Sequence, residues 1–404
     1  MNAVATTLDI EPELIELRRA IHRHPETGLD LPHTQRLVIE ALNSLPLEVS
    51  TGSGLSSVIA VLRGAMPGPT VLLRGDMDAL PVAENVDVEF RSEIDGAMHA
   101  CGHDLHVAML VGAARLLADR RDELVGDVLF MFQPGEEGFN GARVMIDEGV
   151  LDTTGSRPIA AYALHVMSGN FDSGIVYSRV GAIMAASDVL TVTVHGAGGH
   201  GSAPHLAKDP VTVACEIVGA IQSMLTRTFD AFDPVVVTVG SFHAGSKANV
   251  IPNEATFEAT VRSFSPQNRV ALGERLTRLV RGIAEGHGLT ADVTFDEQYA
   301  VMINDADEAA FVQRAVEDMR GADGFRVMPA PLTSSEDFSE VLNRVPGAYA
   351  LIGACPPGAD PAASAYNHAP EAAFDEAAIM RGAEVLAELA VRRLAAAASD
   401  VAGS

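Results

Sequence analysis

Short apolar runs between residues 56 and 166 constrain the fold more than any other feature of this chain. They read SSVIAVLRG, TVLLRGDMDALP, GDVLFMFQPGEEG and IAAYALHV, and glycine, proline or polar residues delimit them. Continuous apolar runs of this length are typical of strands buried on both faces of a sheet. A long helical pattern, about residues 103–120, lies among them. Strands that alternate with helices predict an α/β sheet.

Other helices and a change of pattern divide the chain. A first helix is expected from Pro12, which suits a first turn, to about His24, because Pro25 ends it. After about residue 181 the strands alternate apolar and polar residues, as in SDVLTVTVHG, with helical segments near 209–228 and 266–287. We therefore expect one domain from 1–181 and 298–404, ending in an Ala-rich helix from about residue 372. An α+β module, 182–297, is inserted into it.

The composition restricts partners and compartment. A formal net charge of −26 argues against nucleic acid, whose phosphates need clustered basic residues. Three widely spaced cysteines imply no disulfide framework and fit a reducing compartment. Neither a signal peptide nor an apolar stretch of membrane-spanning length is recognisable. We expect a cytoplasmic protein that binds neither nucleic acid nor membranes.

Potential metal ligands stand in loops or at the ends of the apolar runs. The segment MHACGHDLH places a cysteine two residues before a histidine, which alone is a weak sign of a metal site. Further candidates occur in QPGEEG, ALHV and AYNHAP. The five candidate ligands are Cys101, His103, Glu137, His165 and His368. Such a set could hold two divalent ions bridged by the thiolate.

The pair Glu136–Glu137 has two interpretations. An isolated pair of glutamates is ordinarily a solvated turn, just as a lone histidine is often a satisfied polar group near the core. Here the pair lies between Pro134–Gly135 and Gly138, directly after a buried strand. A tight turn there would let one carboxylate bind metal and the other accept a proton from water.

The chain resembles the amidohydrolase branch of the M20 metallopeptidase family, which includes hippurate hydrolase and N-acyl-amino-acid deacylases. The matching segments follow the family's order from residue 22 to residue 370: HRHPETG, RGDMDALP, MHACGHDLH, FQPGEEG, ALHV, GGHGSAPH, GSFHAGSKANVIPNEATFEATVRSF, SSEDF and NHAP. The resemblance implies an α/β, mixed-sheet dinuclear-metal hydrolase domain with an inserted α+β lid and dimerisation domain. It also implies two divalent ions per subunit (zinc, manganese, cobalt or nickel), an N-acyl amino acid substrate, and a homodimer or higher oligomer.

The resemblance assigns roles to matched positions. Cys101 would bridge the ions, His103 and His165 would complete one ion site, and Glu137 and His368 the other. Glu136 would be the general base.

Roles outside the ligand set follow from the same resemblance. Asp78 would orient a ligand imidazole, or cap a turn; a histidine binds metal at the place of Asp76 in related branches, and His103 replaces it here. His200 would stabilise oxyanion charge from the lid, often in the partner's site, or is a loop histidine between glycines. Asn249 and Arg262 would hold the substrate carboxylate, unless Arg262 is an exposed strand residue with an ion pair.

The chain departs from the family's pattern at Leu105, Ala197 and Ser334, which bears on substrate preference and not on catalysis. Several activities therefore stay open. The first is amide hydrolysis of N-acyl amino acids, and the second is a dipeptidase or carboxypeptidase with the same centre. A binding protein without turnover and a hydrolase with Cys101 as the nucleophile complete the set.

Overall fold

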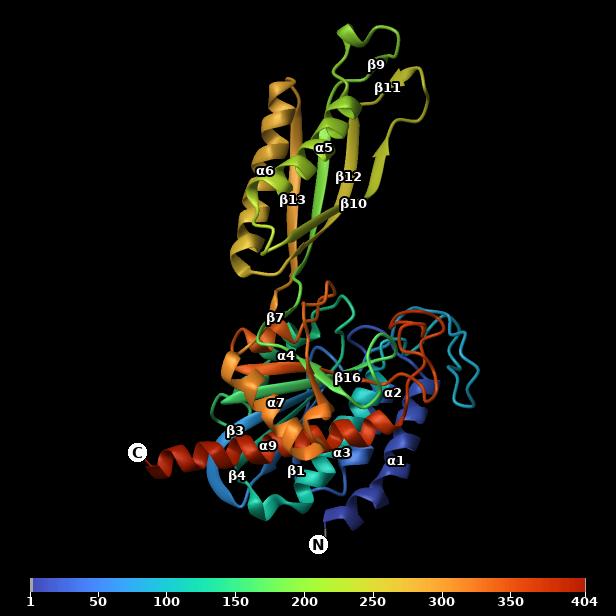
Figure 1. Ribbon diagram of the computed structural model, residues 1–404. Helices are drawn as coiled ribbons and strands as arrows, with labels where there is room; N and C mark the ends of the chain where they lie inside the picture. Colours follow the sequence, from blue (N-terminus) through green and yellow to red (C-terminus); the bar gives the residue numbers. More distant parts are fainter. Residues whose placement is uncertain (1–2, 404) are drawn as a thin grey trace. The chain divides into compact units, whose positions relative to one another are not determined.

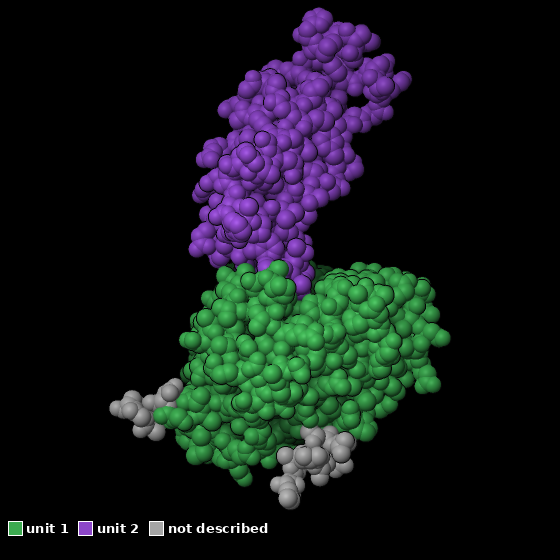
Figure 2. Space-filling model, in the orientation of Figure 1, with its two compact units in different colours: residues 1–183, 303–330, 340–404 green, residues 184–302, 331–339 purple. Residues whose placement is uncertain are grey.

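The computed structural model describes the backbone of residues 3–403 and the side chains of residues 10–399. The chain forms two compact units (Figure 2). Unit 1 comprises residues 1–183, 303–330 and 340–404, and unit 2 comprises residues 184–302 and 331–339. The sequence boundaries place residues 331–339 in the first domain. The structure groups them with unit 2, where Ala185 N donates to the carbonyl oxygens of Leu332 and Ser334.

Unit 1 is built on one mixed eight-stranded sheet with the order β1-β2-β4-β3-β5-β16-β6-β15. The strands are β1 (Leu47–Thr51), β2 (Val58–Arg63), β3 (Met66–Asp76), β4 (Val125–Gln133), β5 (Ala160–Met167), β6 (Val176–Ser178), β15 (Phe325–Val327) and β16 (Gly347–Gly353). All eight residues of β5 are buried, as its uninterrupted apolar run predicts.

Helices cover this sheet (Figure 1). They are α1 (Ala3–Arg23), α2 (Pro32–Leu42), α3 (His103–Asp119), α4 (Gly141–Asp147), α7 (Ala306–Arg320), α8 (Ser339–Leu342) and α9 (Ala377–Gly403), with 3-10 turns η1 (Arg121–Glu123), η2 (Val150–Asp152) and η4 (Ala322–Gly324). The helices α3 and α9 pack against each other and against β3 and β5. Their apolar side chains close one continuous core that includes Leu105, Leu110 and Leu386.

Two helix boundaries differ from the predictions. The helix α1 begins at Ala3 and continues through Pro12, so this proline does not start it. The helix α9 begins at Ala377, five residues later than expected, because Asp375 Oδ1 accepts from Ala377 N and caps the helix.

Unit 2 has a core of its own. Its antiparallel sheet has the order β10-β12-β8-β13, and helices α5 and α6 pack together beside it. The elements are β8 (Ser187–His195), α5 (Pro210–Thr228), β10 (Val235–Ala244), β12 (Glu254–Ser263), α6 (Pro266–Gly286) and β13 (Thr290–Tyr299), with the small strands β9 (Gly199–His200) and β11 (Val250–Ile251) and the turn η3 (Pro204–Leu206). Alternate residues of β12 are buried, as expected for a sheet with one covered face.

Strands β7 (Gly181–Met184) and β14 (Met302–Asn304) pair where the chain leaves unit 1 and where it returns. None of the described helices is long and apolar enough to span a bilayer.

Candidate metal centre

One edge of the large sheet collects the predicted ligands. The strands β4, β3, β5 and β16 are neighbours, and β3 runs parallel to β4 and β5, as β16 does to β5. The carboxyl ends of parallel strands meet at one edge. Segments that follow these strands therefore bring together residues far apart in the sequence.

The five predicted ligands converge around the thiol of Cys101. The Sγ atom lies 3.3 Å from His165 Nε2 and 3.2 Å from His368 Nε2. Glu137 Oε1 lies 3.2 Å from His368 Nε2 and 4.0 Å from His103 Nε2. Candidate ligand atoms form two overlapping groups that share the thiol, Cys101–His103–His165 and Cys101–Glu137–His368, each within 4.8 Å.

Hydrogen bonds to carbonyls fix two of the imidazoles. His103 Nδ1 lies 2.8 Å from the Asp78 carbonyl oxygen, and His165 Nδ1 lies 2.8 Å from that of Val166. A carbonyl only accepts, so each Nδ1 carries a proton, and Nε2 is the ring nitrogen that can offer a lone pair to a metal in the cluster. Metal-binding histidines typically donate their other ring nitrogen in this way.

The donor set fits divalent ions. His103 Nε2 is buried and, among the described residues, has no hydrogen-bond partner. Buried polar atoms rarely stay unsatisfied. A thiolate, three imidazoles and a carboxylate suit zinc, cobalt or nickel.

Charged groups around the centre favour the replacement of a bound proton by a metal ion. Hydrogen bonds to Cys101 and Glu137 raise the pKa of His368 to about 10. Burial alone would raise the pKa of Glu137, but its hydrogen bond to His368 and the charge of His103 lower it. A divalent ion bound here would displace the His368 proton.

Asp78 organises the glutamate turn more than an imidazole. Its carboxylate accepts from Glu136 N and Glu137 N, both at 3.0 Å. Its Oδ1 lies 3.5 Å from His103 Nδ1, whereas its backbone carbonyl makes the 2.8 Å contact. Asp78 thus combines the two roles that the sequence left open, capping the turn and orienting His103.

The start of α3 needs a glycine. Gly102 has φ +83°, and a Cβ there would lie 2.4 Å from Val166 Cγ2. Any side chain would push α3 and β5 apart. Leu105, where the family commonly has glycine, is fully buried in the core, so it repacks the helix start.

Two residues near the centre were missed as functional by the sequence analysis. Asn367 Nδ2 donates to the carbonyl oxygens of Cys101 (3.2 Å) and Val166 (3.0 Å), and so joins two ligand-bearing segments. Its position beside His368 in AYNHAP was the available signal. His106 is buried among the ligands, with its ring 4.7 Å from that of His165.

In unit 2 the structure brings His200 and Asn249 together but not Arg262. The exposed His200 pairs with Val250 between β9 and β11, and the Asn249 carbonyl accepts from Gly201 N at 2.9 Å. Arg262 lies near the other end of β12, half-buried, where its Nη1 donates to Ser335 Oγ at 3.1 Å. Burial lowers the pKa of Arg262, and no described carboxylate forms an ion pair with it.

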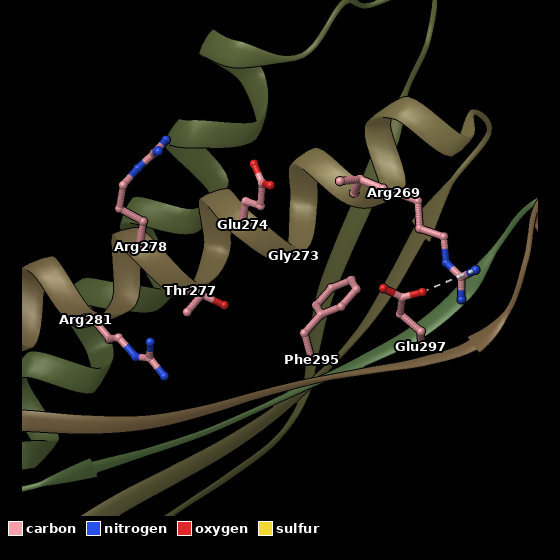
Figure 3. Close-up of a pocket in the computed structure, with 9 residues that line it drawn as sticks. Arg269, Gly273, Glu274, Thr277, Arg278, Arg281, Phe295 and Glu297 are labelled. Carbon is pink, nitrogen blue, oxygen red and sulfur yellow. Dashed lines mark ion pairs between the residues drawn. The ribbon is translucent and has the colours of Figure 1, made fainter.

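Unit 2 also has a hollow of about 540 Å³ between α6 and β13 (Figure 3). Arg269 on its wall is held by Asp188 at 2.6 Å and faces Glu297 at 3.8 Å. Because Asp188 and Glu297 already pair with the Arg269 guanidinium, this group is not available to bind a ligand.

Comparison with known proteins decides the family. The model of peptidase family M20/M25/M40 matches residues 72–392. The chain belongs to this family. The predicted family and fold class are thereby confirmed, and the protein is a hydrolase.

Relatives of this M20 chain cover nearly its whole length. Thermostable carboxypeptidase 1 of Saccharolobus solfataricus is 38% identical over 95% of this chain and 96% of its own. Hippurate hydrolase of Campylobacter jejuni is 32% identical over 98% of this chain and 100% of its own. The structure of the YXEP protein of Bacillus subtilis, a dinuclear metal binding peptidase from the M20 family, has a TM-score of 0.82 at 31% identity, covering 96% of this chain and 99% of that one.

Proposed function

We propose that this M20 hydrolase cleaves the amide bond of N-acyl amino acids with water, releasing a carboxylic acid and a free amino acid. The observation that carries the proposal is the convergence of Cys101, His103, Glu137, His165 and His368 at one sheet edge, with Glu136 next to them. A hippurate hydrolase among the relatives supports the substrate class.

Two divalent ions per chain would occupy the centre. The thiolate of Cys101 would bind both, with His103 and His165 at one ion and Glu137 and His368 at the other. Such ions lower the pKa of water and draw electron density from an amide carbonyl. Zinc, cobalt and nickel suit these ligands best, and availability could select manganese.

Glu136 would move the proton. Its backbone is fixed by Asp78, and its side chain is buried, 7% exposed. The carboxylate would accept a proton from the attacking water at one oxygen and deliver it to the leaving nitrogen. Both transfers need a carboxylate held close to the scissile bond, which the rigid turn provides.

His200 would donate a hydrogen bond to the carbonyl oxygen as its charge develops. Its Nδ1 accepts from Ser202 N at 3.1 Å, so a neutral ring carries its proton on Nε2. The N–H of His200 Nε2 is therefore available to donate to an oxyanion.

Arg262 and Asn249 would hold the substrate carboxylate, for which a half-buried guanidinium without a carboxylate partner is suited. His200 and Arg262 lie toward opposite ends of the sheet of unit 2. The strand β8, which runs between these ends, is about 25 Å long. One copy of unit 2 therefore cannot present both residues to one small substrate. We therefore propose a homodimer in which His200 and the neighbouring Asn249 serve the partner's site, where the partner's own Arg262 completes the carboxylate clamp.

A substrate panel tests the proposal. The protein, reconstituted separately with Zn²⁺, Co²⁺, Ni²⁺ and Mn²⁺, is assayed on N-benzoyl-glycine, N-acetyl amino acids and dipeptides. We expect the highest kcat/KM on acyl amino acids. Faster cleavage of dipeptides would favour a dipeptidase, and no hydrolysis with any ion bound would favour a binding protein.

A carboxypeptidase is the second candidate, because thermostable carboxypeptidase 1 is 38% identical to the chain. The same clamp on a terminal carboxylate would serve peptides. Release of the last residue from amino-blocked peptides of increasing length separates the two activities. A carboxypeptidase would keep its rate as the peptide grows, whereas an acyl amino acid hydrolase would lose it.

Chelation separates the metal centre from a cysteine nucleophile. Cys101 lies within hydrogen-bond distance of two imidazoles, as a nucleophile would. We expect a chelator to abolish activity and added metal to restore it, while bound metal protects Cys101 from alkylation. Activity that survives chelation and is lost on alkylation would assign the nucleophile to Cys101. A reducing, cytoplasmic location would keep this thiolate available as a ligand.

A further inference from the structure

A chain of buried polar side chains lies behind one half of the metal centre. Arg74 Nη1 contacts Asp76 Oδ2 at 2.5 Å, and Asp76 Oδ1 contacts His106 Nδ1 at 2.5 Å. Val166 N donates to His106 Nε2 at 2.8 Å. All three side chains are at most 2% exposed.

These contacts define the tautomer of His106. Its Nε2 accepts from a backbone N–H, so the proton is on Nδ1, which donates to Asp76. Both ring nitrogens are therefore occupied. Although Asp76, His103 and His106 have potential ligand atoms within 4.8 Å of one another, His106 has no lone pair left for a metal.

The same chain joins the elements that carry His103 and His165. Asp76 ends β3, two residues before Asp78, whose carbonyl accepts from His103. His106 is one turn beyond His103 on α3, and Val166 directly follows His165 on β5. Asp76 Oδ2 also lies 3.6 Å from His103 Nε2.

The other half of the centre is held by contacts that do not involve Asp76 or His106. Glu137 is fixed through Asp78, and His368 N donates to the Ala100 carbonyl at 2.9 Å. The contacts of Asp76 and His106 described above reach neither Glu137 nor His368.

We propose that Asp76 and His106 are positioning residues for one ion site only. They hold α3 and β5 at the separation at which His103 and His165 bind the same ion. They therefore set the affinity of the Cys101–His103–His165 site relative to the Cys101–Glu137–His368 site. This inference rests on the proposed dinuclear centre.

A titration of metal-free protein with Co²⁺ tests the proposed positioning role. Binding is monitored by calorimetry and by the visible absorption of the bound ion. The wild-type protein should take up two equivalents. In Asp76→Asn, an amide cannot accept from both Arg74 and His106. We expect one equivalent to keep its affinity and the other to weaken about 10- to 100-fold. His106→Asn, which cannot reach Val166 N in the same way, should weaken the same equivalent.

Glu308→Gln is the matched control. Glu308 is another buried carboxylate of unit 1, 5% exposed, held by Tyr162 and by Arg393 at 2.9 Å. This variant should lower the melting temperature but leave both Co²⁺ equivalents and the visible spectrum unchanged.

A double-variant cycle identifies the site. In His103→Ala protein, which should keep only the Cys101–Glu137–His368 site, adding Asp76→Asn should change the remaining affinity less than twofold. Further weakening there, equal weakening of both equivalents in Asp76→Asn, or unchanged binding in both positioning variants would overturn the inference. A wild-type protein that binds fewer than two ions would instead refute the dinuclear centre on which it rests.

Discussion

At the scale of single residues, adjacent glutamates have different surroundings. The N–H groups of both are fixed to Asp78, but the carboxylate of Glu137 faces His368 and His103, whereas Glu136 is buried beside them. Neighbouring carboxylates in different environments can take different chemical roles. We infer that Glu137 binds metal and that Glu136 transfers protons.

Glu136→Gln tests this division of roles. The amide has the same shape but cannot accept a proton, so kcat should fall about 100- to 10,000-fold while metal content stays at two ions per chain. Turnover and metal content are measured on the same preparation. Glu340 is a similarly buried glutamate that pairs with Arg344. The Glu340→Gln variant is the control and should keep the wild-type activity. Near-normal rates in Glu136→Gln would remove the base assignment.

The sequence was sufficient to select the five candidate ligands, because each stands in a short motif whose residue types suit a metal. It could not reveal the work of Asn367 or His106. Asn367 contacts Val166, which is 201 residues away along the chain, and only the fold brings them together. The tautomer of His106 on α3 likewise depends on a backbone N–H of the strand β5.

At the scale of elements, α1 fixes the first turn of α3, which carries His103. Asp104 Oδ2 lies 2.7 Å from Arg18 Nε and 2.8 Å from His22 Nδ1. His22 Nε2 lies 3.1 Å from Glu84 Oε1. Both ring nitrogens of His22 thus face carboxylates, which favours the charged imidazolium.

His22→Gln should remove a pH-dependent part of the stability. Burial alone would lower the pKa of His22, but Asp104 and Glu84 raise it above 6.5 despite the charge of Arg18. A raised folded pKa contributes stability that is complete below the unfolded value and is lost as the pH rises through the folded value. Each unit of increase corresponds to about 1.4 kcal/mol.

Urea unfolding with a chelator present measures this effect at about pH 6 and about pH 9. The difference in unfolding free energy between wild type and His22→Gln should be larger at the lower pH. Burial lowers the pKa of the neighbouring His99 to about 3, so it stays neutral in both folded proteins and its contribution cancels. A difference that does not change with pH would contradict a charged His22.

Several elements were predictable from pattern and others were not. The strands β2 to β5 follow from apolar runs, and α3 from its helical period. The start of α1 was placed wrongly because Pro12 resembles a first-turn residue, yet the helix continues through it. The helix α2 carried a signal that the sequence analysis did not use, with Pro32 at its start and Thr34, Val38 and Leu42 buried at helical spacing.

At the scale of the whole molecule, two separate cores support two units. The core of unit 1 surrounds α3 and the central strands, and that of unit 2 lies between its sheet and α5 and α6. The change from uninterrupted to alternating apolar patterns made this division visible in the sequence. The assignment of residues 331–339 was not visible, because backbone hydrogen bonds to Ala185 decide it.

Calorimetry should therefore show two unfolding transitions, and only one should respond to metal. All five candidate ligands belong to unit 1. A ligand present at 100 times its dissociation constant stabilises the folded state by about 2.7 kcal/mol. Chelation should lower the melting temperature of one transition and leave the other within error. A single transition, or equal shifts of both, would show that the units unfold together.

The central claim is that two divalent ions share the thiolate of Cys101. The most direct measurement is anomalous scattering from crystals of the protein grown with Co²⁺ or Zn²⁺. We predict two peaks per chain, one bounded by Cys101, His103 and His165 and the other by Cys101, Glu137 and His368. A single peak, or two peaks that do not share Cys101, would contradict the account.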